Sequence, residues 1–127
     1  MREIKFRAKQ NKNGKWLYGG IAHLRDVPAI IVNYIEEDFG SYLDENYIIP
    51  ETVGQFTGLR DKKGKEIYEG DIVKDSLGYI GEIIYKDKYT AFVVKNWENG
   101  YKWWYDKQIE VIGNIYENPE LLEKESR

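Results

Sequence analysis

The sequence predicts a mainly β fold, and three observations support this prediction. Aromatic residues make up 15% of the 127-residue chain, with 11 Tyr and 4 Trp, and aromatic side chains favour strands. Two Asn-Gly pairs, at positions 13–14 and 99–100, carry the strongest short signal for a β-hairpin. Residues 57–73, TGLRDKKGKEIYEGDIV, are typical of strand, tight turn, strand, glycine break and strand.

The first Asn-Gly pair predicts an N-terminal hairpin. Residues 3–9 alternate between apolar and charged side chains, as in a half-buried strand. A two-residue loop at Asn13 and Gly14 would return residues 15–21 antiparallel and pair Phe6 with Ile21. The apolar face of this hairpin would hold Phe6, Ala8, Leu17 and Ile21. The opposite face would hold Arg7, Lys9, Trp16 and Tyr18.

The middle of the chain gives shorter signals. Residues 29–35 form an apolar run that predicts a buried strand, and residues 36–46 are predicted to form an acidic loop. Residues 61 and 64, an Asp and a Gly, suit the first and last positions of a type I turn. A glycine at position 70 marks a bend before the next strand. We expect these positions to form a structural signature, which is Gly58, Asp61, Gly64, Gly70 and Asp71.

The second Asn-Gly pair predicts a hairpin between residues 89–98 and 101–108, after a strand over residues 78–85. With a two-residue loop, one face would hold Phe92, Val94, Tyr101, Trp103 and Tyr105. The other face would place a Lys opposite each Trp, namely Lys95, Trp97, Lys102 and Trp104. A three-residue loop would shift this register by one. A capping Asn118 and Pro119 predict a short helix over residues 120–125.

Three of these segments resemble a known family. The stretch GQFTGLRDKKGKEIYEGDIV, the opening MREIKFRA and the closing VIGNIYENPELLE are similar to the YopX family of bacteriophage and prophage proteins. The resemblance runs along the whole chain, with a divergent part between about residues 21 and 46. It implies a small phage-encoded protein with an SH3-type β-barrel in its C-terminal part and no established biochemical activity. We therefore expect an N-terminal β-rich region over residues 1–66, packed on an SH3-type barrel plus short C-terminal helix over residues 67–127.

Charge is divided unevenly along the chain, although the formal net charge is only −3. Residues 1–25 hold seven Lys and Arg against a single acid, Glu3, whereas residues 26–51 hold seven acids and no Lys or Arg. Such blocks can neutralise each other within the fold or between subunits. Cysteine is absent, which excludes disulfides and thiolate metal sites. With no signal-like or membrane-length apolar segment, we expect a protein of the bacterial host cytoplasm that has no membrane partner.

Patterns for catalysis and metal binding do not hold together. The single histidine, His23, has no Gly-x-Ser-x-Gly nucleophile motif to act on. Residues 58–66 are similar to a phosphate-binding loop, but the glycine spacing is one residue too long and Glu66 replaces the Ser or Thr that would bind Mg²⁺. The acids of residues 36–45 lack the pattern of a calcium loop. We expect no enzymatic activity, no cofactor and no metal site, with a hydrolytic enzyme using an acidic site as the remote alternative.

The mixed aromatic and basic faces of the two hairpins are the main functional hypothesis. The candidate interaction surface is Arg7, Lys9, Trp16, Tyr18, Lys95, Trp97, Lys102 and Trp104. A purely structural interpretation is that Lys stems cover the Trp rings, with a cation–π contribution of about 0.5–1 kcal/mol. A second is that the rings are buried against the rest of the chain or another subunit.

These interpretations lead to two functional predictions. We favour a non-enzymatic binding or assembly module that self-associates, with an unknown phage or host protein as a further partner. The alternative is an accessory protein that binds single-stranded nucleic acid by stacking bases on the Trp and Tyr rings. The acidic net charge disfavours that alternative.

Overall fold

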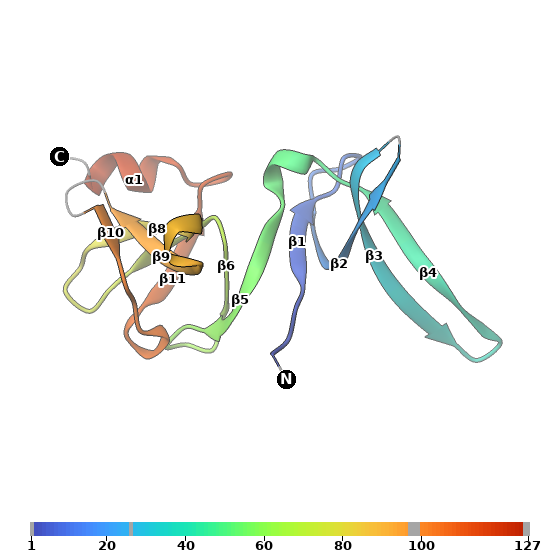
Figure 1. Ribbon diagram of the computed structural model, residues 1–127, viewed down its shortest axis with the longest axis horizontal. Helices are drawn as coiled ribbons and strands as arrows, with labels where there is room; N and C mark the ends of the chain where they lie inside the picture. The colour runs from blue at the N-terminus through green and yellow to red at the C-terminus, as the bar shows by residue number, and fades with distance from the viewer. Residues whose placement is uncertain (1, 26, 97–99, 126–127) are drawn as a thin grey trace. The chain divides into compact units, whose positions relative to one another are not determined.

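The computed structural model describes residues 2–25, 27–96 and 100–125 and is built mainly of antiparallel strands, as predicted (Figure 1). Its contacts divide the chain into two compact units, Met1–Gln55 and Phe56–Arg127, which we call the N-unit and the C-unit. The described strands form one six-stranded sheet and one five-stranded sheet.

The N-unit is a meander of four strands followed by a short turn. The strands are β1 (Phe6–Lys9), β2 (Trp16–Leu24), β3 (Val27–Glu37) and β4 (Gly40–Tyr47). A 3₁₀ turn, Pro50–Thr52, leads into β5 (Gly54–Arg60), whose first residues pair with β1. The core holds Ala8, Ile31 and Ile48, with Phe6, Leu17, Ile21 and Val53 packed against them. The predicted apolar face of the first hairpin is therefore confirmed.

The register of the first hairpin differs from the prediction by two residues. Phe6 pairs with Gly19 rather than with Ile21. The cause is a four-residue loop, in which the Gln10 N–H donates to the Lys15 carbonyl at 2.8 Å. A shift by two residues leaves every side chain on its predicted face, because side chains alternate along a strand with a period of two.

The predicted acidic loop over residues 36–46 is wrong. Strands β3 and β4 pair without interruption from Ile30 and Tyr47 to Glu37 and Gly40, and only residues 38 and 39 form the turn. Because β4 lies at the edge of its sheet, acidic residues there are compatible with pairing on one side only. Strands β3 and β4 therefore pair although residues 36–46 lack the alternation that is typical of a strand.

The described part of the C-unit contains the remaining strands and one α-helix. They are β6 (Glu66–Tyr68), β7 (Asp71–Lys74), β8 (Ile80–Lys86), β9 (Ala91–Asn96), β10 (Gly100–Lys102), β11 (Glu110–Asn114) and α1 (Glu120–Glu125). One core consists of Ile67, Val73, Ile83, Val94, Ile109 and Val111. The six-stranded sheet has the strand order β4-β3-β2-β1-β5-β6, and the five-stranded sheet of this unit is an open row with the order β10-β9-β8-β7-β11.

The second face of this sheet is also partly covered. Ile72 and Val93 are fully buried although alternation points them away from Val73 and Val94. Helix α1 contacts β8 and supplies cover for this second face (Figure 1). The predicted short C-terminal helix is confirmed.

The predicted register of the second hairpin is wrong. Tyr101 pairs with Lys95, and Lys102 pairs with Val94. The connection between β9 and β10 spans three residues, 97–99, which lie outside the described residues and include Trp97. This longer connection displaces the predicted pairing by an odd number of positions, which exchanges the two faces. Lys102 therefore shares a face with Val94, and Tyr101 shares one with Lys95.

Glu82 is an acid on the helix-covered face of the C-unit, and its substitution gives a first prediction. Burial raises the pKa of Glu82 above its ordinary value, and the Glu69 charge adds to this, whereas Lys95 opposes it. Because the folded state favours the protonated form, ionisation at neutral pH destabilises the fold. We expect Glu82→Gln to stabilise the protein at pH 7 by about 0.5–1 kcal/mol, allowing for solvent screening.

The pH dependence of this effect provides the check. The gain from Glu82→Gln should be largest above the folded pKa and disappear below the ordinary value of 4.5. Urea denaturation of the wild type and Glu82→Gln at neutral and at acidic pH measures the stability gain in each range. A variant less stable than the wild type at pH 7 would show that the Glu82 carboxylate is stabilising.

Candidate interaction surfaces

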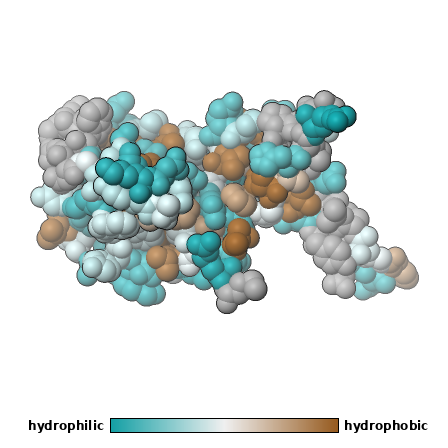
Figure 2. Space-filling model, viewed as in Figure 1, coloured by the Kyte–Doolittle hydropathy of each residue, from teal (hydrophilic) through white to brown (hydrophobic). Residues whose placement is uncertain are grey.

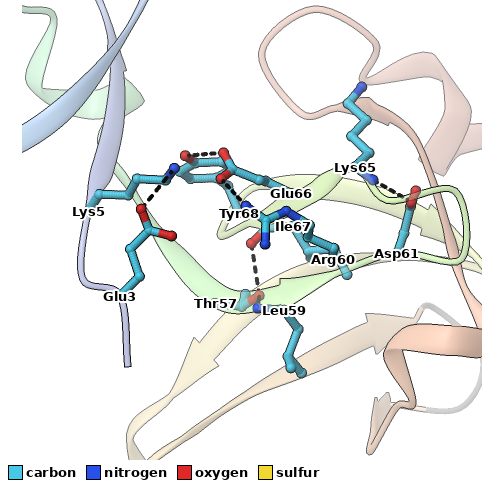
Figure 3. A network of polar contacts seen from close by, with 10 residues as sticks. All are labelled: Glu3, Lys5, Thr57, Leu59, Arg60, Asp61, Lys65, Glu66, Ile67 and Tyr68. Carbon is cyan, nitrogen blue, oxygen red and sulfur yellow. Dashed lines mark hydrogen bonds and ion pairs between the residues drawn. The ribbon is translucent and has the colours of Figure 1, made fainter. Parts of the chain in front are cut away.

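Two turns with the same pattern, Asp-x-x-Gly, organise the C-unit. In the first, the Asp61 Oδ1 accepts hydrogen bonds from the N–H groups of Lys63 and Lys65, both at 2.9 Å. The Gly64 N–H donates to the Asp61 carbonyl at 2.9 Å, and Gly64 has φ +86°, which suits glycine. The predicted turn is confirmed, and Figure 3 shows the Asp61–Lys65 contact.

The second turn repeats this geometry and was not predicted. The Asp75 Oδ1 accepts from the N–H groups of Leu77 and Tyr79, both at 2.9 Å, and the Gly78 N–H donates to the Asp75 carbonyl at 3.0 Å. The signal was present in the sequence, since Asp75 and Gly78 have the spacing of Asp61 and Gly64. This turn matters because it places Asp75 and Tyr79 beside the pocket described next.

The remaining signature residues also serve the backbone. Asp71 is buried and accepts a hydrogen bond from the Tyr68 N–H at 2.7 Å. Gly58 and Gly70 have φ angles of +92° and +93°. Nearby, Glu66 binds the Arg60 guanidinium at 3.2 Å and accepts from the Tyr68 hydroxyl at 3.0 Å (Figure 3). These side-chain contacts connect the neighbouring strands β5 and β6.

A small aromatic pocket lies next to the Asp75 turn. It has a volume of about 200 Å³. We call it the aromatic pocket, and its lining includes Asp75, Tyr79, Lys102, Trp103, Trp104 and Tyr105, together with the core residues Val73, Val94 and Ile109. Three of its rings reach the surface: Trp103 is 67% exposed, Tyr105 72% and Tyr79 41%.

The two neighbouring tryptophans of the pocket differ in environment. Trp104 packs against the C-unit core, and its Nε1 donates a hydrogen bond to the Phe92 carbonyl at 3.0 Å. The predicted position of Trp104 on an outer face opposite Lys95 is therefore wrong. Trp103 instead contacts the ring of Tyr89, with 5.6 Å between the ring centroids. The segment after β10 is not a strand, so strand alternation does not govern it.

Lys102 contributes the positive charge of the pocket. Its Nζ lies 3.8 Å from the Asp75 Oδ2 and 4.7 Å from the centroid of the Tyr79 ring. Neither partner is the Trp that the sequence suggested. Lys95 is exposed on the opposite face, beside Tyr101.

The basic and aromatic residues of the first hairpin form a separate group in the N-unit. The Arg7 guanidinium lies 4.6 Å from the centroid of the Trp16 ring, and the Lys9 Nζ lies 5.4 Å from it. Arg7 is buried, whereas Tyr18 is 47% exposed. Both cations thus lie against the Trp16 ring, as the purely structural interpretation of this face expects.

The described part of the chain has neither a cluster of metal ligands nor a membrane-spanning helix. There, no three His, Cys, Asp or Glu side chains lie close enough to hold a metal ion. None of the described helices has the length and apolar character needed to cross a membrane.

Comparison with known proteins identifies the family. A family model described as YopX protein matches residues 5–123. The chain belongs to the YopX family. This YopX protein is also similar to a solved structure described as the crystal structure of protein EF1440 from Enterococcus faecalis, with 28% sequence identity and a TM-score of 0.63. The match covers 96% of this chain and 99% of that chain. No curated protein matches it.

Proposed function

We propose that this YopX protein is a non-enzymatic binding module that self-associates through its aromatic pocket. The observation that carries the proposal is the exposure of Trp103, Tyr105 and Tyr79 around one cavity. Trp and Tyr are enriched at the centres of protein interfaces, where their large rings supply most of the binding energy. A cluster of such rings at the surface is a typical docking site.

The polar groups of the pocket suit binding better than catalysis. The Asp75 carboxylate holds its own turn and lies near Lys102, and the Asn96 amide donates to the Ile80 carbonyl at 2.7 Å. These groups serve the fold rather than a reacting substrate. The proposal also includes a phage origin, a location in the host cytoplasm and an SH3-type arrangement of the C-unit. The family resemblance supports the phage origin, and the short strands packed around one core support the SH3-type arrangement.

Removal of the exposed rings is expected to abolish self-association. We predict that the double variant Trp103→Ser and Tyr105→Ser is monomeric at concentrations where the wild type is not, because the substitutions remove the apolar surface of the contact. Size-exclusion chromatography with light scattering measures the mass. Tyr47→Ser is the control, because Tyr47 is 62% exposed but lies on the N-unit. This variant should associate as the wild type does. A wild type that stays monomeric at high micromolar concentration would refute the proposal.

Binding of single-stranded nucleic acid is the second candidate function. The exposed rings beside Lys102 favour it, because bases stack on aromatic side chains and phosphates attract ammonium groups. The net charge of −3 speaks against it. Fluorescence anisotropy with a labelled oligonucleotide at low salt separates the two candidates: salt-sensitive binding lost in the double variant supports this one, and unchanged anisotropy eliminates it.

A further inference from the structure

We propose that Phe39 at the tip of the β3–β4 hairpin of one copy occupies the aromatic pocket of another copy. This inference rests on the self-association proposed above and names the segment that fills the pocket. It joins two features that the single chain leaves unexplained. One is an apolar ring on a hairpin turn, and the other is a ring-lined cavity.

Phe39 breaks the usual chemistry of a turn. Its side chain is fully exposed, with a relative exposure of 103%. Turns favour Gly, Asn, Asp and Pro for backbone reasons, and a Phe there gains nothing from packing within its own chain. Local violations of this kind are expected where a residue serves a function. Figure 2 shows hydrophobic surface at this tip bordered by hydrophilic residues.

The hairpin presents Phe39 in a defined position. Strands β3 and β4 remain paired up to Glu37 and Gly40, so only Asp38 and Phe39 form the turn (Figure 1). A ring carried on paired strands loses less conformational freedom on binding than one on a loose loop. The tip is therefore suited to insertion into a small cavity.

The size and lining of the aromatic pocket suit one aromatic side chain. Its volume of about 200 Å³ is below the range of roughly 300–1,000 Å³ for small-molecule sites. Trp103, Tyr105 and Tyr79 line it and are also exposed to solvent. Aromatic pairs prefer offset or edge-to-face contacts with ring centroids about 4.5–7 Å apart, which a Phe in this pocket can make.

Charge is complementary as well. Glu37 and Asp38 are exposed next to Phe39, whereas the pocket holds Lys102 beside Asp75, and a further cation, Lys107, is exposed in the following turn. The Lys102 Nζ lies 3.8 Å from the Asp75 Oδ2, which is too long for a direct hydrogen bond. The ammonium group can therefore donate a hydrogen bond to a second carboxylate, on the approaching tip.

The contact joins two different surfaces of the same chain. A reciprocal exchange of tips between two copies is isologous, whereas a contact that runs in one direction only is heterologous. Two copies can exchange tips reciprocally, or copies can continue in a row. In either case a copy without its tip still has a pocket to offer, and a copy without its pocket still has a tip.

Complementation of two variants tests the inference. Phe39→Ser removes the tip, and Trp103→Ser removes a wall of the pocket. Each variant alone should associate at least about ten-fold more weakly than the wild type, and an equimolar mixture should recover a one-to-one complex. Light scattering and circular dichroism measure mass and folding. Leu77→Ser is the control, because Leu77 is 81% exposed and should associate as the wild type does.

Three other results would overturn the inference. If Phe39→Ser associated normally and Trp103→Ser did not associate, Phe39 would not be the occupant, although self-association through the pocket would still hold. Failure of the mixture to form a complex would show that the two sites do not meet. A monomeric wild type would overturn both this inference and the proposed function.

Discussion

Substitution of Asp61 by Asn is expected to lower the free energy of unfolding by about 3–4 kcal/mol. Asp61 is 2% exposed, and its two oxygens accept three backbone hydrogen bonds, from Lys63, Lys65 and Val111. An Asn has one oxygen, and its NH₂ group would face a backbone donor. At least one buried N–H would then lose its partner.

Asp75→Asn is a matched control for this effect. Asp75 has the same turn, with two backbone hydrogen bonds to Oδ1, but its Oδ2 lies 3.8 Å from the Lys102 Nζ, at a partly exposed side chain. We expect a loss of only about 1 kcal/mol, because water can replace the missing contact. Urea denaturation of the full chain measures both values. Equal losses would contradict the special role of the Asp61–Val111 contact.

The same carboxylate predicts acid sensitivity. Burial alone would raise the pKa of Asp61, but the N–H groups of Val111, Lys65 and Lys63 and the Lys65 charge lower it below its ordinary value. The stabilisation from ionised Asp61 is therefore complete above 3.8 and is lost as pH falls through the folded pKa. The stability difference between wild type and Asp61→Asn should accordingly shrink in this acidic range.

Substitution of Trp104 by Ala is expected to cost about 2–4 kcal/mol, whereas Trp103→Ala costs about 0.5–1 kcal/mol. Trp104 packs on the C-unit core and donates to the Phe92 carbonyl, so its loss leaves a cavity and an unpaired acceptor. Trp103 is 67% exposed and loses mainly its contact with Tyr89. Trp104→Ala therefore tests the stability of the fold, whereas Trp103→Ala changes the surface used for self-association.

Thermal denaturation of the two single variants provides the comparison. Trp104→Phe is a useful intermediate, since it keeps a ring but loses the Nε1 hydrogen bond, and its cost should be about 1 kcal/mol plus a packing loss. If Trp103→Ala were as destabilising as Trp104→Ala, the assignment of Trp103 to a surface contact would be wrong.

Much of the local structure could be predicted because turn chemistry and strand alternation agree. In the first hairpin, the faces of Ala8 and Leu17 were correct although the loop was longer than predicted. An error of two residues preserves the faces. In the second hairpin the error was odd, so Lys102 moved to the face of Val94. Loop length is the quantity that local sequence determined least well.

The aromatic pocket could not be predicted from strand patterns. Trp103, Trp104 and Tyr105 follow β10 in a segment without strand pairing, so neighbouring rings can point to different environments. Tyr79 reaches the pocket through the overlooked Asp75 turn. Phe39 was hidden in a stretch interpreted as an acidic loop, because its significance depends on the β3–β4 ladder around it. The rings after β10, Tyr79 and Phe39 therefore gain their roles from tertiary contacts and not from local sequence.

Sedimentation velocity of the wild-type YopX protein over a concentration series tests the central claim, that exposed aromatic rings of the C-unit join copies of this chain. We predict that the weight-average sedimentation coefficient rises between low and high micromolar concentration and that Trp103→Ser removes this rise. A single coefficient, independent of concentration and equal for both proteins, would contradict the claim.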